Sequence, residues 1–165
     1  HMPARMDKRY HAVDLLSDIL GGGASSRLHQ TLVKEKKLFS NIDCHHSGST
    51  DAGLLTIEGK LVKGVKIQDA EKAVDEILRQ LQQEPVMEIE LQKVKNKTES
   101  MMAFEDMSVM NRANSLAYYE LLGDAEMMNT ELGLYAAVTS EEIREESKAI
   151  FKEENSNTLY YLSEN

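Results

Sequence analysis

The chain has 165 residues, 41% of them hydrophobic, which suits one globular domain with a real core and excludes an intrinsically disordered chain. Acidic residues outnumber basic residues by 28 to 19 and no basic stripe appears, so nucleic acid and anionic membrane surfaces are excluded as expected partners. Cys44 is the only cysteine, which excludes an internal disulfide, and the apolar runs are too short to predict a transmembrane span or a signal peptide.

The first predicted helix covers residues 12–20. Its apolar residues recur at the spacing of one stripe of an amphipathic helix; they are Ala12, Leu15, Leu16, Ile19 and Leu20. Asp7 is the expected cap at its start. Gly21, Gly22 and Gly23 are expected to end the helix, because glycine enters the left-handed conformation of a helix C-terminus without a steric penalty.

The glycines lead into a second predicted helix, whose free amides Ser25 or Ser26 is expected to cap. The apolar residues of its inner face would be Leu28, Leu32 and Val33. A glycine-rich loop before a helix also suits phosphate, so an anion-binding module at the Gly21–Ser26 corner is an alternative. Dinucleotide and P-loop motifs need a strand before the loop, whereas a helix precedes this one, so helix capping is favoured.

Arg27 is the more informative residue of this corner, because its position predicts an interaction partner. It stands in the first turn of the second helix, where its positive charge opposes the helix dipole at a cost of roughly 0.3–1 kcal/mol. The sequence therefore predicts that a carboxylate elsewhere in the domain pairs with Arg27 and pins the corner, so that Arg27→Ala would lower the thermal stability.

Two alternating runs follow and predict neighbouring antiparallel strands. The first run sets Ile42, Cys44 and His46 on one face and Asn41, Asp43 and His45 on the other. After the turn signal SGSTDAG, the second run sets Leu55, Ile57, Gly59 and Leu61 against Thr56, Glu58 and Lys60. Gly59 is expected to mark a bulge or a close packing contact.

Cys44, His45 and His46 carry side chains of the types that bind zinc. Strand alternation sends His45 away from the other two, and two residues on one face make a poor chelate without a third ligand. A structural strand with one buried cysteine is therefore favoured over a metal site.

The remaining pattern is mostly helical. A third predicted helix ends at Pro85, and residues 87–122 predict a long helix with a bend or break that Gly123 closes. The inner face of the third helix is expected to carry Ala70, Ala73, Val74, Ile77, Leu78 and Leu81. The methionines between Met101 and Met110 are interpreted as flexible core filler, in preference to a promiscuous binding surface.

The last helix has the clearest start signal in the chain. Thr139 and Glu142 form the pattern of a capping box, and Val138 and Ile143 flank it as a hydrophobic staple. Thr158–Leu162 is predicted to be a closing strand.

Helices and strands do not alternate regularly, so a doubly wound parallel sheet is disfavoured. The order predicts an α+β fold, a two-layer α/β sandwich with an antiparallel-rich sheet packed against helices. No repeat or linker divides the chain, so residues 1–165 are expected to form a single domain. A chain that opens directly on MPARMDKRYH is expected to be a piece of a larger protein.

The run LGGGASSRL, from Leu20 to Leu28, with Glu35 and Lys36 after it, resembles the non-zinc domain of the insulinase and pitrilysin family of zinc metallopeptidases. That family includes the mitochondrial processing peptidase and similar bacterial zinc proteases. Its helix-ending pattern is L-G-G-G-x-S-S-R-L, and the motif residues here are Gly21, Gly22, Gly23, Ser25, Ser26, Arg27 and Leu28. The later elements fall in the family's order, so the resemblance extends over essentially the whole chain.

The resemblance implies the C-terminal, inactive half of a clamshell peptidase, which closes over the substrate chamber and helps bind extended peptides. Zinc would belong to a homologous half with an inverted HxxEH motif, in cis or on a partner subunit. No catalytic, cofactor or metal residue is expected in this fragment, and the fragment alone is not expected to cleave peptides. A noncatalytic scaffold or regulatory subunit on the same fold is the alternative.

One departure from the family stands out. Many non-zinc halves carry an arginine and, seven positions later, a tyrosine that help hold the substrate and stabilise the transition state. Val33 and Ser40 occupy those positions here, so no catalytic residue is carried over. The substrate, the oligomeric state and the compartment stay open; a cytoplasmic location is favoured over a periplasmic one.

Overall fold

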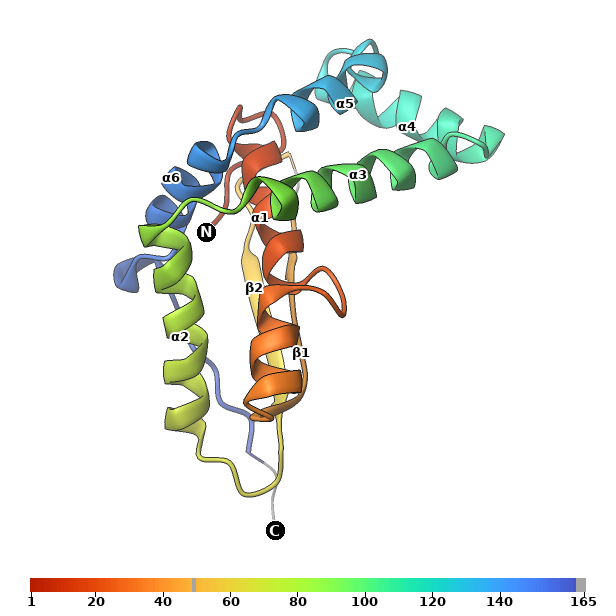
Figure 1. Cartoon of the computed structure of the whole chain (residues 1–165). Helices are drawn as coiled ribbons and strands as arrows, with labels where there is room; N and C mark the ends of the chain where they lie inside the picture. The colour runs from red at the N-terminus through yellow and green to blue at the C-terminus, as the bar shows by residue number, and fades with distance from the viewer. Residues whose placement is uncertain (49, 163–165) are drawn as a thin grey trace.

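The computed structural model describes residues 1–48 and 50–162, which leaves Ser49 of the SGSTDAG turn outside the described part. A β-hairpin and its covering helices form a body, and further helices project from it (Figure 1). The elements in chain order are α1 Tyr10–Gly21, the π-helix η1 His29–Glu35, β1 Phe39–His46, β2 Leu55–Leu61, α2 Ile67–Gln83, α3 Glu88–Glu105, α4 Val109–Leu122, α5 Met127–Ala137, α6 Ser140–Ile150 and the 3-10 helix η2 Glu153–Asn155.

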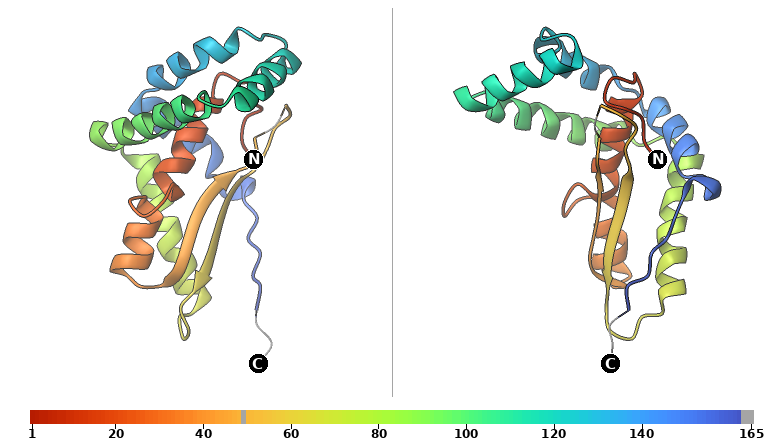
Figure 2. Two further views of the ribbon diagram at one scale, coloured as in Figure 1. Left: turned by 90° about the vertical axis from the view of Figure 1, so that its right-hand side faces the viewer. Right: turned by 180° about the vertical axis from the view of Figure 1, so that it is seen from behind.

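The body has two layers, as the sequence predicts. The antiparallel pair β1 and β2 forms one layer, and α1, η1 and α2 lie on one face of it (Figure 2). Leu16 and Leu20 of α1, Leu32 of η1 and Leu81 of α2 are fully buried in one core cluster with the inward side chains of β1. The predicted α+β sandwich is confirmed.

The hairpin follows the predicted alternation. Ile42 and Cys44 are buried, whereas Asp43 and His45 between and after them are exposed. The pairing shifts by one residue between Phe39 and Asn41, so the irregularity falls on β1. Gly59 supplies the close contact, because a Cβ atom there would lie 2.7 Å from the ring of Phe39.

The long helical region breaks where a bend is expected. α3 ends at Glu105, and α4 begins after Ser108, whose hydroxyl accepts a hydrogen bond from the Asn111 amide at 3.3 Å. Gly123 ends α4 in the left-handed region at φ 105°. The break turns the chain back, so that α4 and α5 return toward the body from the far end of α3 (Figure 1).

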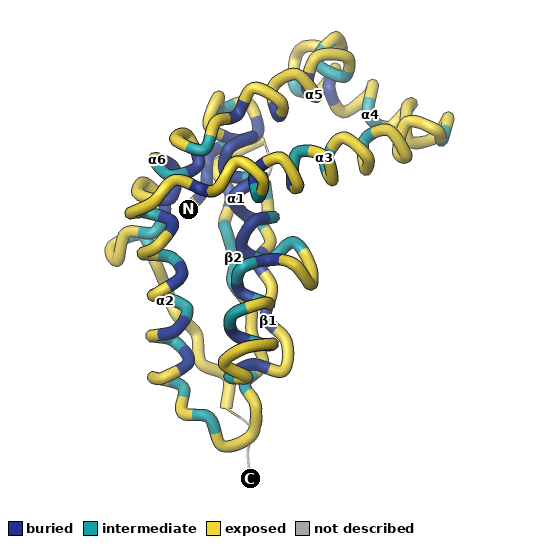
Figure 3. The backbone as a smooth tube through the Cα atoms, viewed as in Figure 1, coloured by how far each residue is buried: buried dark blue, intermediate teal, exposed yellow. Residues whose placement is uncertain are grey.

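We call residues 99–134 the arm; it comprises the distal part of α3, all of α4 and most of α5. Most residues of the arm are exposed, whereas α1 and α2 carry many buried residues (Figure 3). Met101, Met107 and Met110 are exposed, and only Met102 packs against the core. The interpretation of these methionines as core filler is therefore wrong for three of them, because the arm extends beyond the layer that would cover them.

The C-terminal prediction of a strand over Thr158–Leu162 is also wrong. The segment after η2 is extended but joins no sheet, and its Leu159 and Tyr161 side chains are almost fully exposed. The Tyr160 hydroxyl donates to Glu71 of α2 at 2.8 Å. Alternating apolar residues make a strand only beside a free partner edge, and no such pairing occurs in the described part of the chain.

Of the two caps predicted at α1 and α6, the structure confirms the one at α6 and contradicts the one at α1. At α6, Thr139 and Glu142 form the complete reciprocal capping box. At α1 the N-cap is Arg9, not Asp7. The Asp7 carboxylate instead accepts the Arg9 amide at 2.9 Å and the Arg9 guanidinium, so it stabilises the turn before the helix.

Candidate functional site

Two features of the backbone require glycine at this corner: the close approach of β1 to Gly21 and the left-handed conformation of Gly23. α1 ends at Gly21, where a Cβ atom would stand 1.9 Å from the Cys44 backbone nitrogen, so only glycine lets β1 come this close. Gly22 donates its amide to the Asp18 carbonyl at 2.8 Å. Gly23, at φ 106°, is the residue that adopts the left-handed conformation.

The serines do not cap the next helix through their side chains. The Ser26 hydroxyl is buried and has no hydrogen-bond partner in the described structure, while its carbonyl accepts the Gln30 amide at 2.9 Å. Leu28 is fully buried, as expected for the inner face. The capping prediction fails because the Ser26 hydroxyl is buried inside the corner and accepts from none of the amides in the described structure.

Arg27 has the carboxylate partner that its position predicts. Its Nε and Nη2 atoms donate to the two carboxylate oxygens of Glu90 in α3, at 3.0 and 2.7 Å. Both side chains are partly buried, and a bidentate arginine–carboxylate pair is the strong form of this interaction. The pair holds the corner against α3. It also neutralises the positive charge of Arg27, which an anion bound at Gly21–Ser26 would otherwise use.

Val33 and Ser40 are the two positions that the resemblance aligns with an arginine and a tyrosine of the family. Val33 packs partly buried against the core. The Ser40 hydroxyl donates to the Lys60 carbonyl across the hairpin at 3.0 Å. Their contacts are those of packing and of strand pairing.

Cys44, His45 and His46 do not converge on one point. Burial in the core raises the pKa of the Cys44 thiol to about 12, so it is protonated at neutral pH. His45 faces the open side of the hairpin, and His46 bonds to Asp14 of α1. No group of three or more His, Cys, Asp or Glu side chains within residues 1–48 and 50–162 is arranged to hold a metal ion, so these residues do not fit the family's zinc.

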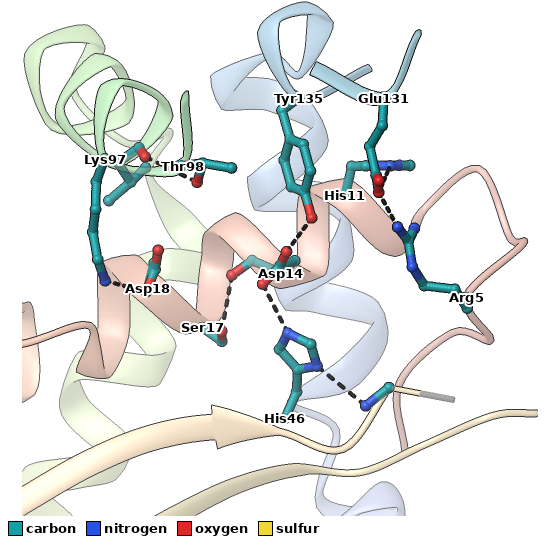
Figure 4. A network of polar contacts seen from close by, with 12 residues as sticks. Arg5, His11, Asp14, Ser17, Asp18, His46, Lys97, Thr98, Glu131 and Tyr135 are labelled. Atoms are coloured by element: carbon teal, nitrogen blue, oxygen red, sulfur yellow. Dashed lines mark hydrogen bonds and ion pairs between the residues drawn. The ribbon is translucent and has the colours of Figure 1, made fainter. Parts of the chain in front are cut away.

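A polar network that sequence reasoning missed lies at the other end of α1 (Figure 4). Asp14 is its centre, because it accepts the Nε2–H of His46 at 2.7 Å and the hydroxyl of Tyr135 in α5. The Gly48 amide donates to Nδ1 of His46 at 3.2 Å, which fixes the tautomer with the proton on Nε2. One carboxylate thus joins the first helix, the end of β1 and α5.

Glu131 forms the second half of the network. This carboxylate in α5 is buried, accepts a hydrogen bond from the Arg5 guanidinium and lies 3.3 Å from Nε2 of His11. Arg5 also stacks over the rings of Tyr10, at 4.5 Å from its centroid, and of Tyr119 in α4, at 5.9 Å. The N-terminal residues therefore fasten α4 and α5 to the body.

The ionisation of the network follows from its contacts. Burial by itself would raise the pKa of Asp14, but the hydrogen bonds from His46 and Tyr135 and the nearby charges hold that pKa below its ordinary value. Burial and the charge of Asp14 raise the pKa of Tyr135 and raise that of Tyr10 to about 12. Asp14 is therefore a carboxylate flanked by neutral phenols, an arrangement suited to holding elements together.

One sequence signal could have located this network. His11 and Asp14 stand three residues apart, and Glu131 and Tyr135 stand four residues apart, so each pair lies on one face of its helix. Buried polar groups need partners, so such residues predict one another. Glu131 lies 120 residues from His11 and Tyr135 lies 121 residues from Asp14, beyond the reach of any local pattern.

The fold and corner define a class: an α+β half-domain whose LGGGASSRL turn joins two packed helices and whose described residues hold no metal-ligand group. The family pattern of the peptidase M16 inactive domain matches residues 1–98, more than half of the chain. The chain belongs to this family of zinc-peptidase inactive domains.

Individual relatives agree with this assignment. The chain is 25% identical over 148 residues to a Bacillus subtilis protein named uncharacterized zinc protease YmxG, covering 89% of this chain and 36% of that protein. A protease from Helicobacter pylori matches with a TM-score of 0.82 and 25% identity over 92% of this chain and 37% of that one. The chain thus spans little more than a third of the length of these relatives.

A third relative is a separate domain. The inactive peptidase domain from Bordetella parapertussis has the same fold, with a TM-score of 0.83 at 21% identity, over 94% of this chain and 82% of that one.

No helix in the described residues is both long and apolar enough to cross a membrane.

Proposed function

We propose that this chain is the C-terminal, non-zinc half of a zinc metalloendopeptidase, that it closes over the substrate chamber and that it helps to bind extended peptides. The proposal rests chiefly on membership of the inactive-domain family. Zinc and the water that it activates would come from a homologous half, in cis or on a partner subunit. Residues 1–165 would then be one structural domain of the larger enzyme.

The open face of the hairpin is the surface that we assign to the peptide. Helices cover its other face, whereas Asn41, Asp43, His45 and Glu58 point away from the core and are exposed. An extended peptide can contact strands through its backbone and through alternate side chains. A domain that closes over a chamber needs one covered face and one open face, and this hairpin has both.

Charge on this face indicates which peptides it would favour. Asp43 and Glu58 stand directly opposite each other in the strand register and are both exposed. Like charges directly opposite each other destabilise a sheet. A lysine or arginine side chain of a bound peptide would relieve this repulsion, so the proposed role carries a preference for basic side chains.

An assay of the full-length parent protein tests the proposed function. A quenched peptide should be cleaved by the parent and not after a chelator has removed its metal, and the residues upstream of this half should contain HxxEH. A parent that lacks HxxEH and cleaves nothing would favour the alternative, a noncatalytic scaffold or regulatory subunit on the same fold.

The peptide preference has its own test in the active parent. Asp43→Asn with Glu58→Gln should raise KM for peptides with a basic side chain at the matching position and leave KM unchanged for their neutral analogues. Lys60→Gln on the same face is the control with the opposite charge change. Equal effects on basic and neutral peptides would show that the two carboxylates do not select the substrate.

A further inference from the structure

The arm carries an apolar stripe that nothing in the described structure covers. Val109 and Leu116 lie on one side of α4, Met110 and Leu121 lie on the adjoining side, and each is at least half exposed. Tyr119 lies on the side of the helix opposite Met110 and Leu121, and it is buried beside Arg5. α4 is therefore held by one side while its apolar side faces outward.

The same surface continues onto the neighbouring segments. Phe104 near the end of α3 and Met107 in the turn are 73% and 79% exposed. Six of the nine methionines of the chain lie in the arm. Methionine side chains are flexible and polarizable, and surfaces rich in them adapt to partners of varied shape.

The arm is strongly acidic. Residues 99–134 contain seven acidic residues and a single basic one, Arg112. Glu131 is buried against Arg5, and the other six carboxylates are exposed and take part in no ion pair formed by the described residues. These six are Glu99, Glu105, Asp106, Glu120, Asp124 and Glu126.

We propose that the apolar, acidic surface of the arm is a docking site for a basic amphipathic polypeptide segment. Its apolar side chains would lie on the stripe of α4, and its lysines or arginines would meet the unpaired carboxylates around that stripe. A second copy of this chain is a poor occupant, because six negative charges would face six more. An anionic membrane surface is repelled for the same reason.

A designed peptide tests this proposal on the 165-residue chain. The probe is a labelled helical peptide of about 18 residues, five turns, with leucines on one face and lysines on the other. Its fluorescence anisotropy should rise to saturation with the chain, and its affinity should fall with rising ionic strength. The analogue with glutamate in place of lysine should not bind.

Variants locate the binding surface. Met110→Asp with Leu121→Asp should weaken binding about tenfold, equivalent to 1.4 kcal/mol. Glu105→Gln with Asp106→Asn should weaken it mainly at low salt. Leu159→Asp, at a 91% exposed leucine outside the arm, is the matched control and should leave binding unchanged.

Four results would overturn the proposal. They are equal binding of the glutamate analogue, equal affinity of the arm variants, a dimer that Leu121→Asp dissociates, and binding to this chain that is lost in the full-length parent. The last two would assign the surface to a second copy or to the parent's own other half. Because peptide cleavage is not the readout, the peptidase proposal can stand or fall separately.

Discussion

The body and the arm are built from the same kinds of helix and differ in what covers them. In the body, helix faces with leucine and isoleucine at helical spacing meet the hairpin and are fully buried. In the arm, α4 carries a similar stripe that meets solvent. The comparison shows that an apolar stripe specifies a helix with a partner, while the identity and position of the partner come from elsewhere in the chain or outside it.

The largest expected effect is on the free energy of unfolding, and it comes from replacing a leucine by alanine in the body and in the arm. Leu20→Ala in the body removes a fully buried side chain and should cost about 4 kcal/mol of unfolding free energy. Leu121→Ala in the arm, at a 76% exposed residue, should change it by less than about 0.5 kcal/mol. Urea unfolding of both variants measures this difference. Similar losses of unfolding free energy would contradict the view that the apolar side of the arm is uncovered.

The next effect concerns the fastening of the arm. Glu131→Gln leaves the buried Arg5 guanidinium without its counter-charge and should cost about 3 kcal/mol. Hydrogen exchange should then accelerate in α5 and α4 before it does in α1. Glu126→Gln, an exposed neighbour on the arm, is the matched control. Uniform acceleration along the chain would show that the network supports the whole fold and not the arm in particular.

A smaller effect is expected at the glycine corner. Arg27→Ala breaks the bidentate pair with Glu90 and should cost about 1–2 kcal/mol, because the pair is only partly buried. The melting temperature should fall, and Lys36→Ala, which removes the exposed pair with Glu76, should leave it nearly unchanged. An unchanged melting temperature in Arg27→Ala would refute the view that this pair pins the corner.

The pH dependence of stability tests the centre of the network. The pKa of Asp14 is lower in the folded than in the unfolded protein, where it is about 3.9. Its stabilising contribution is therefore complete above the unfolded pKa and is lost as the pH falls through the folded pKa. Asp14→Asn should flatten the acid limb of the stability profile, and an identical limb would exclude Asp14 as a cause.

The smallest expected effect is chemical. With its pKa raised to about 12 by burial, Cys44 should not react with a thiol reagent such as DTNB in the native protein. It should react fully after denaturation in urea. Rapid native labelling would contradict the buried position of Cys44 beside Gly21.

The body could be predicted from the sequence because its signals are local. Alternation predicted β1 and β2, the helical stripe predicted α2, and the dipole argument predicted a carboxylate for Arg27 before Glu90 was known. Each of these depends on residues within a few positions of one another, where spacing decides which face a side chain occupies.

The arm and the network could not be predicted in the same way. The methionines of the arm have the same spacing whether or not a layer covers them, so the pattern could not show that Met107 and Met110 are exposed. Asp14 and Tyr135 are 121 residues apart, and no local rule pairs them. The strand predicted at Thr158–Leu162 failed for a related reason, since pairing depends on an available edge.

Reconstitution tests most directly the central claim that this chain is the non-zinc half of a peptidase. The upstream half of the parent and this chain, purified separately and then mixed, should be assayed on a quenched extended peptide. We predict that neither half alone cleaves it, that the mixture does, and that a chelator abolishes the activity. Cleavage by this chain alone, or an upstream half whose activity is unchanged by this chain, would contradict the account.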